Sequence, residues 1–262
     1  MTILDQIIAS KKREIAVKKA VISVQQLENS DLFNSKLNSL SKSIINSPFG
    51  IIAEHKRRSP SKGTINHKLS VEAIVKGYES AGASGISVLT DSQYFGGSLE
   101  DLVLAKAAVK TPLLRKEFII DEYQILEAKA NGAAAILLIA AVLTKAEIKS
   151  LSEFAHSIAL EVLLEVHNQE ELEKSIMPSL DIIGVNNRNL KTFEMNLQTS
   201  LDIITQIPDD FVKISESGLS AIEDIILLKT HGFQGFLIGE NFMKTENPGD
   251  SLEQFINQLK RK

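Results

Sequence analysis

The sequence predicts an α/β protein, a (β/α)₈ barrel of the TIM type with an extra N-terminal helical extension. Short apolar runs bounded by glycine or proline recur along the chain, each is followed by a longer segment of helical periodicity, and eight such pairs follow one another. Runs that are apolar on both faces are typical of parallel strands covered by helices, and strict alternation indicates right-handed βαβ units. We expect residues 1–262 to form a single barrel domain, with residues 1–48 as the extension.

The N-terminal segment predicts an amphipathic helix that precedes the barrel. Thr2 followed by Asp5 is typical of a helix start. Apolar residues then recur on one side of the helix, namely Ile3, Leu4, Ile7, Ile8 and Ile15. Residues 23–48, rich in serine and asparagine with spaced leucine and isoleucine, predict one or two further short helices or a loose connection.

The eight strand-helix pairs occupy the rest of the chain. The expected strands are Gly50–Glu54, Gly85–Leu89, Pro112–Lys116, Ala134–Ile139, Glu161–Glu165, Asp181–Asn186, Val212–Glu216 and Gly235–Gly239. The expected helices are Val71–Ala81, Leu99–Val109, Glu122–Asn131, Lys145–Leu160, Gln169–Ser175, Leu197–Gln206, Ser220–His231 and Leu252–Lys260. A doubly wound open sheet would also alternate in this way, but the Gly-x-Gly-x-x-Gly turn expected after its first strand is missing.

Composition narrows the functional classes. Lysine and arginine total 29 against 33 acidic residues, and the net charge of −4 argues against broad attraction to nucleic acid or to a membrane surface. The absence of cysteine removes disulfides and thiolate chemistry, and with only five scattered histidines we expect no metal site. No apolar block near the N-terminus is long enough for a signal peptide or a membrane span, so we expect a cytoplasmic protein. We expect a monomer that binds a small phosphorylated substrate, with an oligomer as the alternative.

Polar residues stand where the strands of a barrel would build an active site, at their C-terminal ends. They follow six of the runs: Glu54 with Lys56, Thr90-Asp91, Arg115-Lys116-Glu117, Glu165, Asn186-Asn187-Arg188, and Ser215-Glu216-Ser217-Gly218. Strand alternation puts Glu54 and Lys56 on one face of their strand, with His55 facing outward in a structural role. A charged residue after a strand is usually a solvated loop residue or a helix cap, so the functional interpretation depends on their convergence.

Lys116 is the least easily dismissed of these residues. Leu-Leu ends two residues before it and Phe-Ile-Ile begins two residues after it, which leaves a cation among core residues. A buried lysine costs free energy unless it is paired or used. A structural salt bridge with Glu54 or Glu165 remains the alternative. Glu216 could be a partner that orients a lysine.

A phosphate site is expected after the seventh and eighth strands, where barrel enzymes bind phosphate with backbone amides and a short helix. Ser217-Gly218 stands at the first of these places, and Leu237, Gly239 and Glu240 stand at the second. Lys56 would add a cation, and the loop from Ser59 to Gly63 would be a mobile cover for the site.

The sequence resembles the indole-3-glycerol-phosphate synthase family of tryptophan biosynthesis. The matching motifs are residues 51–63 (IIAEHKRRSPSKG), 87–91 (SVLTD), 94–98 (YFGGS), 114–119 (LRKEFI), 164–167 (LEVH), 183–190 (IGVNNRNL) and 215–218 (SESG). The resemblance runs through the whole chain, including the N-terminal helix.

The resemblance implies a cofactor-free lyase that converts 1-(2-carboxyphenylamino)-1-deoxyribulose 5-phosphate to indole-3-glycerol phosphate. Lys116 would be the acid at the ribulose carbonyl in ring closure. Carbon dioxide loss would follow, and then a dehydration whose acid and base steps fall among Glu54, Lys56 and Glu165. These four residues are the expected catalytic groups.

Binding roles follow from the same resemblance. Arg188 and Asn186 would bind the substrate carboxylate and ring, with Phe95 and Phe118 as apolar walls. Residues expected at the phosphate or elsewhere in the binding site are Lys56, Ser59, Glu216, Ser217, Gly218, Leu237, Gly239 and Glu240.

Three other functions are weaker interpretations. A phosphoribosylanthranilate isomerase would need a cysteine base. A nucleic-acid or targeting patch at residues 56–62 conflicts with the net acidity and lacks interleaved aromatic residues. A barrel that binds without catalysis does not account for the full set of Glu54, Lys56, Lys116 and Glu165.

Overall fold

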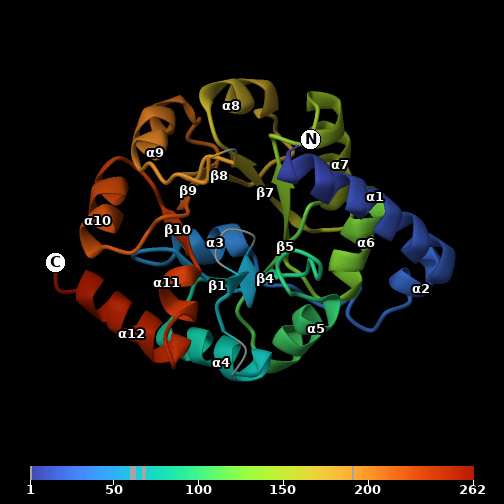
Figure 1. The fold of residues 1–262 in the computed structure, drawn as a ribbon, viewed down its shortest axis with the longest axis horizontal. Helices are drawn as coiled ribbons and strands as arrows, with labels where there is room; N and C mark the ends of the chain where they lie inside the picture. The colour runs from blue at the N-terminus through green and yellow to red at the C-terminus, as the bar shows by residue number, and fades with distance from the viewer. Residues whose placement is uncertain (1, 60–62, 67–68, 191) are drawn as a thin grey trace.

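The computed structural model describes all residues except 1, 60–62, 67–68 and 191, and it confirms the predicted barrel. Eight parallel strands close on themselves in the order β1-β10-β9-β8-β7-β6-β5-β4 (Figure 1). They are β1 (Ile51–His55), β4 (Gly85–Leu89), β5 (Leu113–Lys116), β6 (Ala135–Ile139), β7 (Glu161–Val166), β8 (Ile182–Asn186), β9 (Val212–Glu216) and β10 (Gly235–Ile238). A short antiparallel pair, β2 (Arg58–Ser59) and β3 (Gly63–Thr64), follows β1.

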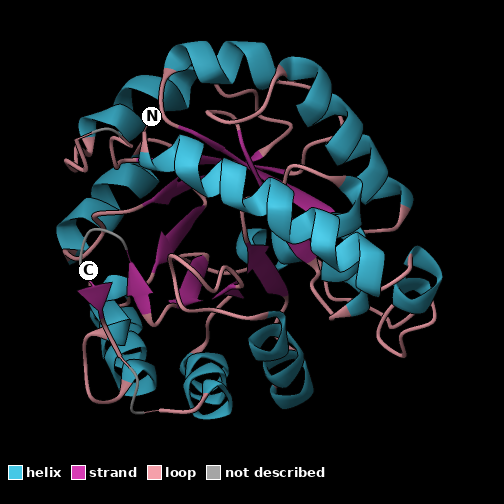
Figure 2. Cartoon of the chain, turned by 45° about the vertical axis from the view of Figure 1, so that its right-hand side comes forward, coloured by secondary structure: helices cyan, strands magenta, loops and turns pink. Residues whose placement is uncertain are grey.

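Helices surround the barrel and cover its outer face (Figure 2). They are α4 (Val71–Ala81), α5 (Leu99–Ala108), α6 (Glu122–Ala130), α7 (Lys145–Ser157), α8 (Gln169–Ser175), α9 (Gln198–Ile203, continued by the 3₁₀ turn Ile204–Gln206), α10 (Ile222–Thr230), α11 (Glu240–Met243) and α12 (Pro248–Leu259). The sequence did not predict α11, which is a single turn. It placed the start of α12 too late, because Asn247 caps the helix and Pro248 occupies its first turn.

The N-terminal extension forms α1 (Ile3–Val21), α2 (Val24–Glu28) and α3 (Leu40–Ile45). The capping box between Thr2 and Asp5 starts α1 as expected. Figure 2 shows α1 lying across the barrel, and its buried residues are Ile7, Lys11 and Ile15. None of the helices within the described residues is long and apolar enough to span a membrane.

The end of the barrel where the strands begin is filled by α3. Leu40 and Ile44 are fully buried and pack with inward-facing strand residues such as Leu114 and Ile214. The carboxylate of Glu161, at the start of β7, accepts the backbone N–H groups of Leu40 at 2.7 Å and Ser41 at 2.9 Å. Anions at a helix N-terminus satisfy its unpaired N–H groups, so this contact fixes α3 in place. The opposite end of the barrel, where the strands finish, is not filled by α3 and is open to form a binding cavity.

Candidate active site

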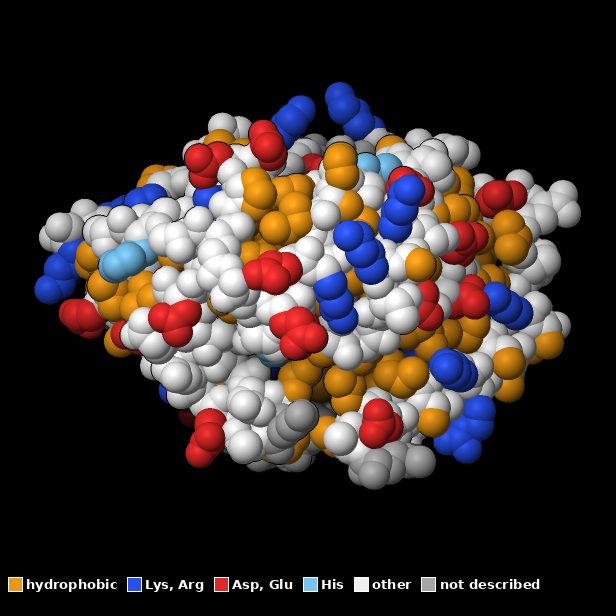
Figure 3. Space-filling view, turned by 90° about the horizontal axis from the view of Figure 1, so that it is seen from above, with side chains coloured by type: hydrophobic (Ala, Val, Ile, Leu, Met, Phe, Trp, Pro, Cys, Tyr) orange, Lys and Arg blue, Asp and Glu red, His pale blue; other side chains and the backbone are white. Residues whose placement is uncertain are grey.

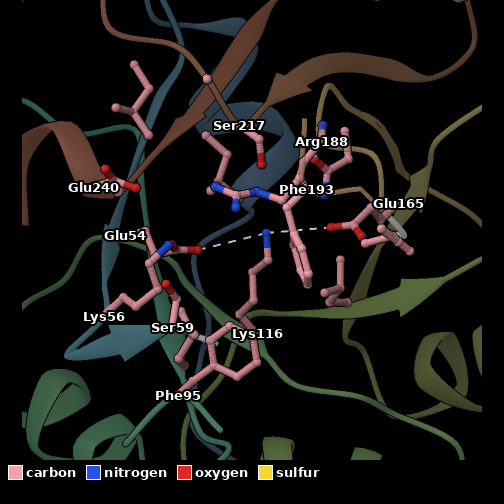
Figure 4. Close-up of a pocket in the computed structure, with 18 of the residues that line it drawn as sticks. Glu54, Lys56, Ser59, Phe95, Lys116, Glu165, Arg188, Phe193, Ser217 and Glu240 are labelled. Atoms are coloured by element: carbon pink, nitrogen blue, oxygen red, sulfur yellow. Dashed lines mark hydrogen bonds and ion pairs between the residues drawn. The ribbon is translucent and has the colours of Figure 1, made fainter. Parts of the chain in front are cut away.

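A cavity of about 670 Å³ opens where the strands finish, and the predicted site residues gather around it (Figure 4). Those that line it are Glu54, Lys56, Ser59, Phe95, Lys116, Phe118, Glu165, Asn186, Arg188, Ser217, Gly218, Leu237, Gly239 and Glu240. Glu216 does not line the cavity, because its side chain is fully buried beneath Lys116. Segments far apart in the sequence therefore converge on one space, as strand alternation predicts.

Lys116 lies at the centre of this group, between Glu54 and Glu165 (Figure 4). Its Nζ is 2.6 Å from Oε2 of Glu216, 3.7 Å from Oε2 of Glu165 and 3.8 Å from Oε2 of Glu54. Burial would lower the pKa of this lysine, but the carboxylates of Glu216, Glu54 and Glu165 outweigh it and raise the pKa above its ordinary value. Lys116 is therefore held as an ammonium ion facing the cavity, which is the state that a general acid needs.

Glu216 is the closest partner of that ammonium ion. Its side chain is fully buried, and burial raises its pKa to about 7 although Lys116 opposes the shift. The neighbouring strand makes room for the carboxylate with a glycine, since a Cβ at Gly184 would clash with Oε1 of Glu216. The geometry makes Glu216 the residue that orients Lys116.

We expect Gly184→Ala to lower kcat by about 10- to 100-fold, because the added methyl group displaces Glu216 and with it Lys116. Steady-state kinetics with a melting curve checks this. The matched control is Ile182→Val, which changes the same inward face of β8 nearer the closed end and should leave kcat near the wild-type value. An unchanged kcat in a folded Gly184→Ala protein would contradict the role of this space.

Glu54 and Lys56 form a second charged pair. Nζ of Lys56 donates to Oε1 of Glu54 at 2.6 Å. Burial would raise the pKa of Glu54, but Lys56 and Lys116 lower it below the ordinary value. Gly239 is packed against this carboxylate, and a Cβ there would clash with it. Glu54 therefore lies ionised between two ammonium groups, next to the end of β10.

Glu165 is held from both sides. Oε2 faces Lys116, and Oε1 lies 3.2 Å from Nε2 of His167. Burial would raise the pKa of Glu165, but the contacts with His167 and Lys116 outweigh it and lower the pKa to about 2. Glu165 is thus an ionised carboxylate, and so a base.

The aromatic wall of the cavity is formed by Phe95 and Phe118, whose ring centroids are 6.0 Å apart. The backbone N–H groups of Tyr94 and Phe95 donate to Oδ1 of Asp91 at 2.6 and 3.1 Å. The N–H of Phe118 donates to Oε1 of Glu117 at 2.9 Å. Two carboxylates therefore fix the backbone of the two ring-bearing loops.

Lys11 of α1 forms salt bridges with both of these carboxylates, Asp91 and Glu117. Its side chain is 2% exposed, and its Nζ lies 2.9 Å from Asp91 and 3.2 Å from Glu117. Ile3, Leu4 and Ile7 of the same helix also line the cavity. The N-terminal helix is therefore part of the site, through one buried cation and an apolar edge.

We expect Lys11→Met to raise KM for the substrate by about tenfold with kcat within a few-fold of wild type, because both aromatic loops lose their common anchor. Initial rates across substrate concentration measure the split. Lys12→Met is the matched control, since Lys12 is the exposed neighbour on the same helix. A folded Lys11→Met protein with unchanged KM would show that the anchor does not shape the pocket.

The loops after β9 and β10 form the opposite side of the cavity. Ser217 and Gly218 both have positive φ, 69° and 74°, so the chain turns sharply after β9. β10 ends at Ile238, and Gly239 is the N-cap residue of α11, which begins at Glu240. Backbone from both loops lines the cavity, as the sequence predicted for this end.

The cations that follow β1 are engaged within the molecule. Arg57 binds both carboxylate oxygens of Asp101, and Arg58 donates to the backbone carbonyls of Ser92 and Gln93. Residues 60–62 of the expected cover loop lie outside the described residues. On the face seen in Figure 3, acidic and basic side chains are interspersed with small apolar patches. These contacts do not favour a nucleic-acid surface.

Sequence reasoning missed several residues of the site. Lys11 could have been found, because it lies four residues from both Ile7 and Ile15 and so interrupts a buried helical stripe. His167 shares the strand face of Glu165 by the same alternation that selected Glu165. Leu190, Phe193 and Met195 also line the cavity, from a loop whose sequence carries no periodic signal.

Known proteins resemble this chain over almost its entire length. The family model described as indole-3-glycerol phosphate synthase matches residues 4–256. An indole-3-glycerol phosphate synthase of Bacteroides thetaiotaomicron is 48% identical over 98% of this chain and 98% of its own. One of Aliarcobacter butzleri is 44% identical over 98% of this chain and 99% of its own.

Solved structures support the fold. A KGPDC from Streptococcus mutans superposes with a TM-score of 0.61 at 15% identity, over 81% of this chain and 97% of its own. A mutant tryptophan synthase α-subunit from Pyrococcus furiosus has a TM-score of 0.59 at 14% identity, over 81% of this chain and 98% of its own. At these identities the likeness concerns the barrel alone.

Proposed function

This chain belongs to the indole-3-glycerol phosphate synthase family, and we propose that its cavity performs the family's reaction with Lys116, Glu54, Lys56 and Glu165 as the proton-transfer groups. The reaction closes the pyrrole ring of 1-(2-carboxyphenylamino)-1-deoxyribulose 5-phosphate and releases carbon dioxide and water. Its product is indole-3-glycerol phosphate, so the enzyme is a carboxy-lyase of tryptophan biosynthesis.

The observation that carries the assignment of residues is the position of Lys116. One ammonium group faces the cavity with three carboxylates within 4 Å of it. The first step forms a bond between the carboxyl-bearing ring carbon and the ribulose carbonyl carbon, and the carbonyl oxygen must gain a proton as it becomes a hydroxyl. Lys116 gives that proton, which is a transfer worth about 10²- to 10⁴-fold in rate.

Decarboxylation and dehydration complete the reaction. Loss of carbon dioxide leaves its bonding electron pair in the ring and restores aromaticity. The hydroxyl then departs with a proton from Lys56, whose ammonium Glu54 orients at 2.6 Å. Glu165, ionised between Lys116 and His167, takes the proton from the ring carbon beside the nitrogen. The leaving hydroxyl and the proton from Lys56 form the water. The ring proton held by Glu165 and one proton from solvent then return Lys56 and Lys116 to their ammonium forms.

Substrate binding follows from the two sides of the cavity. Phe95 and Phe118 contact the aromatic ring, and Arg188 with Asn186 binds its carboxylate before decarboxylation. The phosphate lies at the other side, against Lys56, the hydroxyls of Ser59 and Ser217, and the backbone of Gly218, Gly239 and Glu240, with Leu237 packed beneath.

Two further expectations belong to this proposal. Residues 1–262 act as one domain, because α1 lines the same cavity as the barrel strands. The enzyme works in the cytoplasm, since a charged phosphate ester does not cross a bilayer unaided and must be used where it is made.

The test supplies the carboxyphenylamino-deoxyribulose phosphate to the purified protein and follows indole absorbance and carbon dioxide release. We expect one equivalent of each per substrate consumed. Absence of both from the folded wild-type protein would overturn the proposed function.

A further inference from the structure

His167 directly follows the last residue of β7. It contacts Glu165 but does not line the cavity. Its Nε2 is 3.2 Å from Oε1 of Glu165. The two atoms are within ion-pair distance but lack the alignment of a hydrogen bond. The imidazole therefore stands directly behind the carboxylate that faces Lys116.

The other side of the imidazole is held by α8. Nδ1 of His167 is 3.1 Å from Oε2 of Glu171, which also accepts the backbone N–H of His167 at 2.9 Å. Asn168 in turn donates to Oε1 of Glu171 at 2.9 Å. Each ring nitrogen thus faces a carboxylate. A neutral imidazole has only one N–H and would turn a lone pair toward one of them, so the geometry favours the imidazolium form.

We propose that His167 is a positioning residue that remains an imidazolium and keeps Glu165 ionised, oriented and ready to accept a proton. The inference rests on the proposed function, because it concerns the base of that reaction. No role in contacting substrate is assigned to His167.

The charges around the pair explain why a second cation is needed. The groups that face Glu165 are Lys116 from β5, Glu54 from β1, Glu216 from β9, the neutral Asn186 from β8, and His167. The groups that face His167 are Glu165 and Glu171. Burial alone would lower the pKa of His167, but these two carboxylates raise it to about 10.

Lys116 cannot hold Glu165 ionised throughout the reaction. Its closest partner is Glu216 at 2.6 Å, whereas Glu165 is 3.7 Å away. When Lys116 gives its proton to the substrate it becomes a neutral amine, and three carboxylates lose their shared cation. His167 is not on the proton path, so its charge stays beside Glu165 at that moment. Glu165 therefore stays ionised, and able to accept a proton, after Lys116 has given up its own.

The test compares the pH dependence of kcat in wild type, His167→Gln and Glu171→Gln. Activity that needs ionised Glu165 is present above the pKa of that group and is lost as the pH falls through it. Loss of the imidazolium raises this pKa, so we expect the acid limb of His167→Gln to move up by about one pH unit or more. Glu171→Gln should move it in the same direction by less.

The matched control is His156→Gln. His156 pairs with Asp181 at 2.8 Å near the other end of the barrel, so its loss should leave the acid limb in place. A purely structural role for His167 would lower the melting temperature without moving the limb. An acid limb of His167→Gln that coincides with that of the wild type would overturn the inference.

A second readout does not depend on turnover. Imidazole ¹⁵N chemical shifts of the wild-type protein without substrate should show His167 doubly protonated at pH 8. A neutral His167 at that pH would overturn the inference even if His167→Gln failed to fold. A wild-type protein that makes no indole but shows the imidazolium would contradict the proposed function and leave the charge assignment standing.

Discussion

Replacing Lys116 by alanine is expected to lower turnover by about 10²- to 10⁴-fold while the barrel remains folded. The variant loses the only ammonium that lies within 4 Å of all three buried carboxylates among the described residues. Because Lys116 acts in ring closure, carbon dioxide release and indole formation should fall together. The measurement is the rate of each product in one reaction.

The stability of the same variant should depend on pH. Lys116 helps hold the pKa values of Glu54 and Glu165 below their ordinary values, so its contribution to the free energy of unfolding is present above the unfolded pKa of these groups and is lost as the pH falls through their folded pKa values, about 2 for Glu165. We expect Lys116→Ala to melt well below wild type at pH 8 and to approach it only as the pH falls from about 4 toward 2.

Two further variants serve as controls for the loss of activity in Lys116→Ala. Lys116→Met keeps most of the side-chain volume and should be as inactive as the alanine variant. Lys213→Ala removes a lysine from the opposite end of the barrel, where it pairs with Asp209 at 2.7 Å, and should retain wild-type turnover. Wild-type indole formation by either Lys116 variant would remove this residue from its assigned role.

The second large effect is expected at Glu54, where Glu54→Gln should lower kcat by about 100-fold or more by stalling the dehydration. The amide cannot hold the Lys56 ammonium as the carboxylate does at 2.6 Å. Ring closure and decarboxylation precede this step. A single-turnover experiment should therefore release about one equivalent of carbon dioxide per active site at a near wild-type rate, followed by slow indole formation.

The order in which carbon dioxide and indole appear shows whether Glu54 acts in dehydration or in ring closure. If carbon dioxide and indole slow down by the same factor in Glu54→Gln, Glu54 acts at ring closure. The matched control is Glu240→Gln, a carboxylate at the edge of the same cavity that has no assigned proton transfer. It should form both products together, as the wild type does.

Much of the architecture could be predicted because its signals are local. The strands Gly85–Leu89 and Val212–Glu216 have the expected bounds, and the other barrel strands differ by one residue at one or both ends. Alternation along each strand was enough to predict that Glu54, Lys116 and Glu165 lie at the same end of the barrel, where they line one cavity.

Partner choice could not be predicted from these signals. The sequence allowed a structural salt bridge of Lys116 with Glu54 or Glu165 and allowed Glu216 to orient a lysine. All three carboxylates lie within 4 Å of Nζ of Lys116, and that Glu216 is the closest was not predicted. Lys11 meets Asp91 and Glu117, which lie about 80 and 106 residues later in the sequence, so that contact exists only after the fold has formed. Short local patterns in the sequence do not show which residues so far apart along the chain will be in contact.

The two glycines beside the carboxylates bear on protein engineering. Gly184 leaves the volume that Glu216 occupies, and Gly239 does the same for Glu54. Grafting the lysines and glutamates of this rim onto another barrel would not reproduce their arrangement unless the recipient lacked side chains at both places. A design that keeps every charged group but carries alanine at these two positions should fold with its catalytic carboxylates pushed out of register.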